Sequence, residues 1–277
     1  MPGTLYIVAT PIGNLADASP RSLEVLKSVA LIACEDTRTS RTLLARYGIA
    51  TRTTAVHGHN EQRAAAKLLQ ALADGRDVAL ISDAGTPAIA DPGAHLVQAA
   101  HRAGIRVVPI PGPSAVAAAL SAAGFPAPGY QFAGFLPTGR AARRKALADL
   151  RSDLPVVIYE APHRVQETLQ DLKDRFGEEQ EIVIARELTK KFEEVARMRL
   201  GEAERWLEAA PHRQQGELVL VLAPAERSTE ADPLAEGERV LGLLLESLPA
   251  SEAARLAAKI SGAPKNALYR IALERAK

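Results

Sequence analysis

The sequence predicts an α/β protein that contains two α/β domains followed by a small helical segment. Apolar runs alternate with helix-like segments in the first ~120 residues, which is typical of βαβ units around a parallel sheet. A Gly/Pro-rich break at 124–129 separates this part from a second alternation of the same kind. Five acidic residues within 226–238 mark another boundary, after which the chain becomes basic. The predicted domains are 1–123, 124–226 and 227–277.

Each predicted strand of the first domain is a continuous apolar run, as expected for strands that are covered on both faces. These runs are 5–9, 29–34, 78–81 and 105–110. Ser19 followed by Pro20 predicts a helix start, since serine can cap free backbone N–H groups and proline suits the first helical position. Apolar residues at helical spacing within 60–73 predict a second helix.

The second domain and the tail show further strand and helix patterns. The predicted strands are 156–159, 182–185 and 218–222, and the predicted helices are 141–150 and 165–176. Two more helices, 251–260 with Ser251 as N-cap and 265–275, flank a turn that contains Gly262. Two short helices around such a turn resemble a helix-turn-helix. A small helical cap with a solvated basic face is the alternative.

The composition excludes several classes of protein. Of the 277 residues, 47% are apolar and 24% are charged, which fits a globular protein and neither a disordered nor a fibrous one. A net charge of +1 means that any nucleic-acid surface must be a local basic patch. Cys34 is the single cysteine, which excludes an intramolecular disulfide and suits a reducing compartment. With no signal-peptide pattern and no uncharged apolar stretch near the ~20 residues of a membrane span, we expect a cytoplasmic protein.

Three Gly/Pro-rich turns follow apolar runs, which is where α/β proteins hold ligands at the carboxyl ends of their strands. They are 10–14, 82–87 and 109–115. Gly85 permits close backbone approach to a ligand, and Asp83 can bind hydroxyl groups. Ser114 falls at the start of an Ala-rich helix, where free N–H groups and the helix dipole favour an anion. The sequence therefore predicts a nucleotide-like ligand site without dinucleotide or phosphate-loop motifs, although each turn alone could be purely structural.

Polar side chains in the second domain are candidates for chemistry. The possible proton acceptors, for which a salt bridge or turn contact is the alternative, are Glu160, His163 and Glu187. An acid-free stretch, 136–147, holds basic residues that could bind phosphates or form a solvated face. They are Arg140, Arg143, Arg144 and Lys145. His57 and His59 have no acidic or cysteine partner at ligand spacing, so we predict a polar helix-capping loop there and no metal site.

Seven short motifs occur in order along the chain. They are TPIGNL at 10–15, CEDTR at 34–38, SDAGTP at 82–87, DPG at 91–93, PGPSA at 111–115, YEAPHR at 159–164 and RELTK at 186–190. As a set they closely resemble the ribosomal RNA small subunit methyltransferase I family, which belongs to the tetrapyrrole-methylase-like superfamily. The resemblance extends from Gly3 to about Ala223, and the tail resembles the C-terminal helical segment of that family.

The resemblance implies that S-adenosylmethionine binds in a cleft between the two α/β domains. It implies methyl transfer to the ribose 2′-hydroxyl of a cytidine in the decoding region of 16S rRNA, within the small ribosomal subunit. It also implies a homodimer. The cofactor-binding residues that we expect are Pro11, Gly13, Asp83, Ala84, Gly85, Thr86, Ile89, Ser114, Ala115, Tyr159 and Leu188.

This chemistry needs no metal, because a sulfonium methyl donor is already activated and the protein mainly has to align the reacting atoms. A ribose 2′-hydroxyl is a weak nucleophile, so a nearby base would help to remove its proton. The candidate catalytic residues are Glu187, Lys190 and Glu160. Lys190 could accept the proton only if burial lowered its pKa. The candidate RNA-binding residues are Arg38, Arg140, Arg143, Arg144, Lys145, His163 and Arg164.

Two alternative functions use the same fold. A tetrapyrrole or corrin precursor C-methyltransferase would use the same cofactor, but the basic segment 140–145 and the motifs at 35–38 and 159–164 favour RNA. A non-enzymatic RNA-binding module would have lost the cofactor turns, and this sequence retains them.

Overall fold

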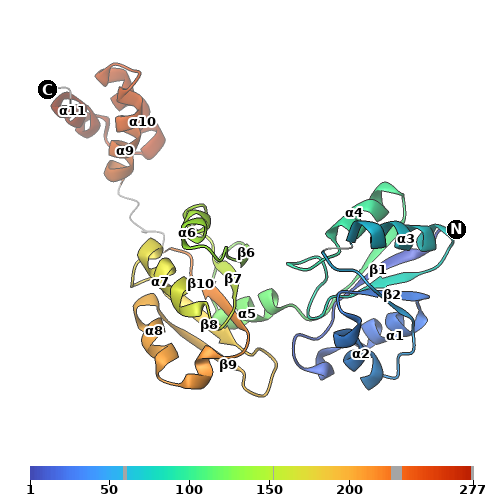
Figure 1. The fold of residues 1–277 in the computed structure, drawn as a ribbon. Coiled ribbons are helices and arrows are strands. Elements are labelled where there is room, and N and C mark those ends of the chain that lie inside the picture. Colours follow the sequence, from blue (N-terminus) through green and yellow to red (C-terminus); the bar gives the residue numbers. More distant parts are fainter. Residues whose placement is uncertain (59–60, 152, 226–232, 276–277) are drawn as a thin grey trace. The chain divides into compact units, whose positions relative to one another are not determined.

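A computed structural model describes residues 1–58, 61–151, 153–225 and 233–275 (Figure 1). The chain divides into two compact units, Met1–Ala223 and Pro224–Lys277. The predicted boundary at 226 and the predicted cap at His59 or Asn60 lie outside the described residues.

The first sheet has five parallel strands in the order β3-β2-β4-β1-β5. The strands are β1 (Thr4–Val8), β2 (Leu31–Cys34), β3 (Thr53–Ala55), β4 (Val78–Leu80) and β5 (Arg106–Ile110). The four predicted apolar runs are confirmed as strands, while β3 was not predicted. Because β4, β1 and β5 are neighbours, the three predicted ligand turns leave the sheet side by side at its carboxyl edge.

Helices cover both faces of this sheet, which explains why its strands are apolar throughout (Figure 1). They are α1 (Pro20–Ser28) and α2 (Thr37–Arg46) on one face, and α3 (Glu61–Ala73) and α4 (Ala94–Arg102) on the other. The predicted start of α1 is confirmed, because the Ser22 N–H donates to the Ser19 hydroxyl oxygen at 3.1 Å. A short 3-10 helix, Leu15–Asp17, follows the first ligand turn.

The second sheet is mixed, in the order β6-β7-β10-β8-β9. Its strands are β6 (Gln131–Phe135), β7 (Val156–Glu160), β8 (Glu181–Arg186), β9 (Glu194–Arg199) and β10 (Leu218–Leu222). The three central strands were predicted, whereas the edge strands β6 and β9 were not. Only the β6–β7 pair is parallel among the pairs of this sheet. A 3-10 helix, Pro211–Gln214, precedes β10.

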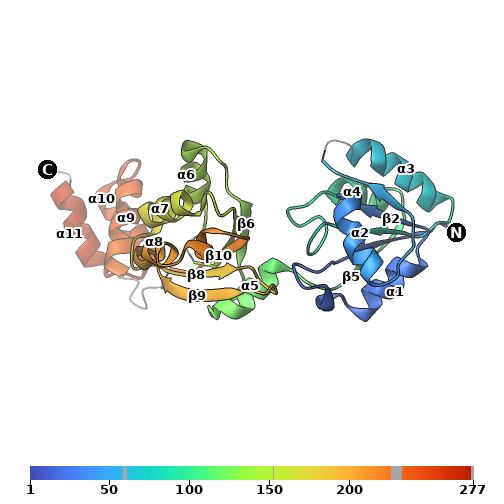
Figure 2. The same ribbon diagram turned by 60° about the horizontal axis from the view of Figure 1, so that its bottom comes forward.

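Helices on opposite faces of the second sheet come from different parts of the chain (Figures 1 and 2). One face packs against α6 (Arg140–Ala148), α7 (Val165–Phe176) and α8 (Leu200–Glu208). The other face packs against α5 (Ala115–Ala123), through side chains such as Val116 and Ala119. The predicted first domain, 1–123, contains α5, but the apolar side chains of α5 pack on the second sheet.

The unit Pro224–Lys277 has a small apolar core of its own, which includes Leu241, Ala254 and Leu268. Its helices are α9 (Pro233–Leu245), α10 (Ala250–Ser261) and α11 (Lys265–Arg275). The two predicted helices are confirmed, but the predicted N-cap at Ser251 is wrong. Helix α10 begins one residue earlier, after Pro249, which supplies no side-chain cap. Within the described residues, no helix is both long enough and apolar enough to cross a membrane.

Candidate functional site

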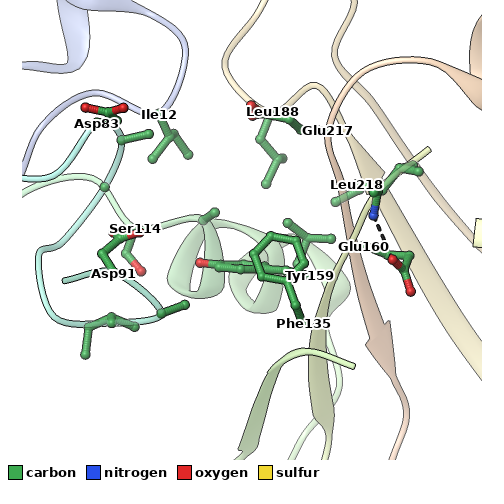
Figure 3. A pocket seen from close by; sticks show the side chains of 18 of the residues that line it. Ile12, Asp83, Asp91, Ser114, Phe135, Tyr159, Glu160, Leu188, Glu217 and Leu218 are labelled. Atoms are coloured by element: carbon green, nitrogen blue, oxygen red, sulfur yellow. Dashed lines mark hydrogen bonds between the residues drawn. The ribbon is translucent and has the colours of Figure 1, made fainter. Parts of the chain in front are cut away.

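A pocket of about 380 Å³ lies at the carboxyl edge of the first sheet, within the unit Met1–Ala223 (Figure 3). Its volume falls within the range of ~300–1,000 Å³ that is typical of small-molecule sites. The segments that follow β1, β4 and β5 supply Ile12, Asp83, Ala84, Gly85, Thr86, Ile89, Ala90, Asp91, Ser114 and Ala115. The second sheet and its loops supply Phe135, Tyr159, Glu160, Ala161, Pro162, Ala185, Leu188, Glu217, Leu218 and Val219.

Hydrogen bonds join the three ligand turns that were predicted from the sequence. Thr10 and Gly85 exchange two backbone bonds, with the Thr10 N–H donating at 2.9 Å and the Gly85 N–H donating at 3.0 Å. The Thr86 hydroxyl donates to the Pro113 carbonyl at 3.2 Å, which ties the second turn to the third. The three turns therefore form one continuous wall of the pocket.

The loop after β4 is held in an unusual backbone conformation. Ala88 and Ala90 have φ of 66° and 65°, a left-handed region that side chains with a Cβ rarely adopt. The buried Glu61 carboxylate accepts bonds from the Gly93 N–H at 3.0 Å and the His95 N–H at 3.1 Å. These bonds cap α4 and fix the end of the strained loop, so this wall is preorganised.

Most residues predicted to bind the cofactor line this pocket. They are Asp83, Ala84, Gly85, Thr86, Ile89, Ser114, Ala115, Tyr159 and Leu188. Pro11 and Gly13 do not line the pocket. They flank Ile12, which does line it. Sequence reasoning did not select Asp91, Phe135 or Glu217. The motif at 91–93 could have indicated Asp91, whereas Glu217 reaches the pocket only because β10 lies between β7 and β8.

Aromatic rings form part of the opposite wall (Figure 3). Tyr159 packs edge-on against Phe132 and Phe135, with ring centroids 5.0 and 5.5 Å apart. Phe135 is 59% exposed and could stack with a planar group. Burial, together with the charge of Asp91, raises the pKa of the Tyr159 hydroxyl above its ordinary value of 10.0. Tyr159 therefore stays protonated and can donate a hydrogen bond.

A second cavity, of about 420 Å³, shares Asp83 with this pocket. It is lined by Glu35, Asp36, Thr37, Arg38, Ala55, His57 and Asp83. Burial raises the pKa of the Glu35 carboxyl, and the charges of Asp83 and Asp91 raise it further. Across the described part of the chain, no group of three or more histidine, cysteine or acidic side chains is arranged to hold a metal ion.

Glu160 is the predicted catalytic residue that lines the pocket. Its buried carboxylate accepts bonds from the Thr168 hydroxyl at 2.5 Å and the Ala161 N–H at 2.8 Å, and it lies 3.4 Å from Nε of Arg164. Glu187 does not line the pocket, but its neighbour in sequence, Leu188, does. Glu160 is thus the one candidate of the three that lines the pocket, and these bonds hold its buried carboxylate.

Lys190 could accept a proton only if burial lowered its pKa, and its surroundings do not meet this condition. Burial alone would lower the pKa of its ammonium, but bonds to Glu187 at 2.9 Å and Glu217 at 3.1 Å outweigh burial and raise that pKa above 10.5. Burial would raise the pKa of Glu187, but the Glu217 N–H and Lys190 outweigh it and hold that pKa below 4.5. These contacts therefore do not favour Lys190 as the proton acceptor.

Arg143 corrects the predicted RNA-binding set. Its side chain is only 1% exposed, and Nε donates to the Asp171 carboxylate at 2.7 Å. Its other nitrogens donate to the Thr138 carbonyl and to Glu167, both at 3.2 Å. Arg143 joins α6 to α7 and has no surface to offer RNA. Arg164 is similarly occupied, because its guanidinium donates to the Leu136 carbonyl at 2.6 Å.

The remaining predicted RNA contacts are accessible. Arg38 is 86% exposed and pairs with Asp36. Arg140 and Arg144 are also exposed, and both pair with the buried Asp171 carboxylate. Lys145 and His163 are exposed.

Comparison with known proteins places this geometry in a family. Residues 4–204 match the Tetrapyrrole (Corrin/Porphyrin) Methylases family, and residues 231–276 match the RsmI C-terminal HTH domain. The chain is 50% identical over 275 residues to ribosomal RNA small subunit methyltransferase I of Pseudomonas aeruginosa, covering 99% of this chain and 98% of that protein. It is 48% identical over 273 residues to the Escherichia coli O157:H7 protein of the same name, covering 98% and 95%.

Solved structures with low sequence identity share the fold. A cobalt precorrin-4 methyltransferase superposes with a TM-score of 0.59 at 17% identity, covering 79% of this chain and 94% of that one. A diphthine synthase superposes with a TM-score of 0.60 at 15% identity, covering 80% and 90%. The fold predicted from the alternating pattern is therefore confirmed, and the chain is a methyltransferase that belongs to the ribosomal RNA small subunit methyltransferase I family.

Proposed function

We propose that this protein transfers a methyl group from S-adenosylmethionine to the ribose 2′-hydroxyl of a cytidine in the decoding region of 16S rRNA. The observation that carries the proposal is that the strand-end motifs of both sheets line a single pocket. Relatives that are 50% and 48% identical over nearly the whole chain are named ribosomal RNA small subunit methyltransferase I. We propose that the substrate is the rRNA within the small ribosomal subunit in the cytoplasm.

The chemistry of the pocket fits S-adenosylmethionine. Its walls are mainly apolar, as the adenine ring requires, and the Asp83 and Asp91 carboxylates suit hydroxyl and cationic groups. The start of α5, which follows Ser114, is the positive end of the helix dipole and suits a carboxylate. Gly85 has a φ of 81°, a backbone conformation that glycine adopts without strain. When bound, the sulfonium supplies an activated methyl group.

We propose that protein side chains orient the acceptor hydroxyl and remove its proton. Glu160 is our first candidate for the proton acceptor because it lines the pocket, and Glu187, next to Leu188, is the alternative. Arg38, Arg140, Arg144, Lys145 and His163 are the accessible side chains that we propose for RNA contact. We also propose a homodimer, as the resemblance implies, which light scattering can test.

A C-methyltransferase that acts on tetrapyrrole precursors is the rival function. To distinguish the two functions, the protein is incubated with labelled S-adenosylmethionine and with small ribosomal subunits, naked rRNA or a tetrapyrrole precursor. We expect label in the rRNA of the subunits. Label confined to the macrocycle would sink the proposal, and RNA binding without any transfer would favour a non-enzymatic module.

A further inference from the structure

The turn between β8 and β9 holds one pocket residue between two strained ones. Leu188 lines the pocket, and its neighbours Glu187 and Thr189 have φ of 50° and 66°. Residues with a Cβ rarely adopt this left-handed conformation, and it persists only where surrounding contacts enforce it. The contacts of this turn therefore decide where Leu188 lies.

Lys190 makes two ion pairs at this turn, where the Glu193 carboxylate also accepts a bond from the Thr189 N–H. Its ammonium donates to the carboxylates of Glu187 at 2.9 Å and of Glu217 at 3.1 Å. The Glu217 N–H also donates to the Glu187 carboxylate at 2.8 Å, and the Glu187 N–H donates to the Glu217 carbonyl at 2.9 Å. The ammonium thus joins the turn to the start of β10, where Glu217 and Leu218 line the pocket.

The aliphatic part of Lys190 packs against the first ligand turn. A Cβ built on Gly13 would lie 2.5 Å from Cγ and 3.0 Å from Cε of Lys190, so the lysine fills the space that a side chain there would need. Ile12, the neighbour of Gly13, lines the pocket. Lys190 therefore touches all three of the segments that carry Ile12, Leu188 and Glu217.

Arg186 braces the other end of the same turn. Its buried guanidinium donates from Nε to the Gln215 carbonyl and from Nη1 to the Phe192 carbonyl, both at 2.8 Å. These bonds hold the ends of the loop, whereas the bonds of Lys190 hold the strained part beside Leu188. With two carboxylates around it, Lys190 stays an ammonium and has no free electron pair to accept a proton.

We infer that Lys190 is a positioning residue, whose ammonium and aliphatic stem hold Leu188 and Glu217 in the wall of the cofactor pocket. This inference rests on the proposed function, because the effect is expected on S-adenosylmethionine binding. Lys190 acts through its neighbours and takes no part in the proton transfer.

The test compares two substitutions that separate charge from basicity. Lys190→Met keeps a stem of similar length and removes both ion pairs. Lys190→Arg keeps a cation between the two carboxylates but cannot lose its proton at working pH. Lys191→Met is the matched control, because Lys191 is exposed and its ammonium lies over the Phe192 ring, 5.4 Å from the centroid. Lys190→Gln replaces the methionine variant if the latter does not fold.

Two readouts are needed for each variant. Calorimetry gives the Kd for S-adenosylmethionine, and labelled methyl transfer to small subunits gives kcat between about pH 6 and 9. We expect Lys190→Met to raise Kd about tenfold or more. We expect Lys190→Arg and Lys191→Met to keep Kd within about threefold of the wild type, with the same dependence of kcat on pH.

Two results would overturn the inference. One is a Lys190→Met variant that binds S-adenosylmethionine as the wild type does. The other is a Lys190→Arg variant that binds the cofactor normally but has lost transfer, because that result would make Lys190 the proton acceptor. A wild-type protein that binds no S-adenosylmethionine would instead contradict the proposed function, so the two failures are distinguishable.

Discussion

Arg143 shows how far a single residue can differ from what its local sequence indicates. It lies in an acid-free stretch, which predicts a phosphate-binding or solvated face. Its partners, Asp171 and Glu167, lie on another helix and are 28 and 24 residues away in sequence. The local pattern of charge carries no information about such partners. A buried arginine with three hydrogen bonds stabilises helix packing and leaves RNA contact to its exposed neighbours.

Removing the Arg143 side chain should therefore affect folding more than substrate binding. Arg143→Met leaves the buried Asp171 carboxylate with only the exposed Arg140 and Arg144 as cationic partners. We expect a loss of about 3 kcal/mol in the free energy of unfolding, measured by urea titration. The control is Lys145→Met, an exposed position on the same helix, with an expected change below about 0.5 kcal/mol. Equal losses in the two variants would contradict the structural role of Arg143.

The same network predicts a specific dependence of stability on pH. Burial would raise the pKa of Asp171, but hydrogen bonds from Arg144, Arg143 and Arg140 outweigh it and hold that pKa below its ordinary value of 3.8. The stability that this carboxylate contributes is present above about pH 3.8 and is lost as pH falls through the lower folded pKa. The difference in unfolding free energy between wild type and Asp171→Asn should shrink on acidification below that pH. A difference that stays constant down to about pH 2 would contradict this prediction.

At the scale of elements, helix α6 carries the exposed bases Arg140, Arg144 and Lys145 beside the buried Arg143. Replacing Arg140 and Lys145 by glutamine should weaken RNA binding and reduce its salt dependence, by a slope of about one per lost phosphate contact. The Kd for S-adenosylmethionine should not change, because neither residue lines the pocket. Filter binding at several salt concentrations measures both the RNA affinity and its salt dependence.

The control for that experiment is a pair of exposed arginines that the sequence did not mark for RNA contact. Arg175→Gln with Arg205→Gln removes the same charge from α7 and α8. If both double variants lose RNA affinity equally, the effect comes from net charge and not from α6.

Strands could be predicted from the sequence where burial of both faces leaves a simple apolar pattern. Strands with both faces covered, such as β1 and β10, are continuous apolar runs and were found. The edge strand β9 alternates between half-buried and exposed residues and contains charged side chains, so it gave no such run. The edge strand β3 has only three residues. Edge strands are fixed by pairing with a neighbour, which is a tertiary effect.

The pocket likewise has parts that the local sequence indicates and parts that only strand pairing brings together. The turns after β1, β4 and β5 have Gly and Pro signals of their own, and their convergence follows from the strand order. Glu217 has no local signal, because strand pairing brings it beside Glu187 from a distance of 30 residues. The side chain of Lys190 was selected for its chemistry, but only its contacts reveal a positioning role.

At the scale of the whole molecule, the two compact units have separate cores. Every residue that lines the pocket belongs to the unit Met1–Ala223. A chain that ends at Ala223 should therefore bind S-adenosylmethionine as the full chain does, measured by calorimetry. We expect its RNA affinity to fall, since the removed unit matches a helix-turn-helix domain. Loss of cofactor binding on truncation would contradict the assignment of the pocket to one unit.

The central claim is that this pocket delivers a methyl group to a ribose in small-subunit rRNA. The most direct measurement digests rRNA from small subunits treated with the protein and labelled S-adenosylmethionine, and identifies the labelled nucleoside by mass spectrometry. We expect one labelled nucleoside, a cytidine, with the methyl group on its sugar fragment. A methyl group on the base fragment, or on a nucleoside other than cytidine, would contradict it.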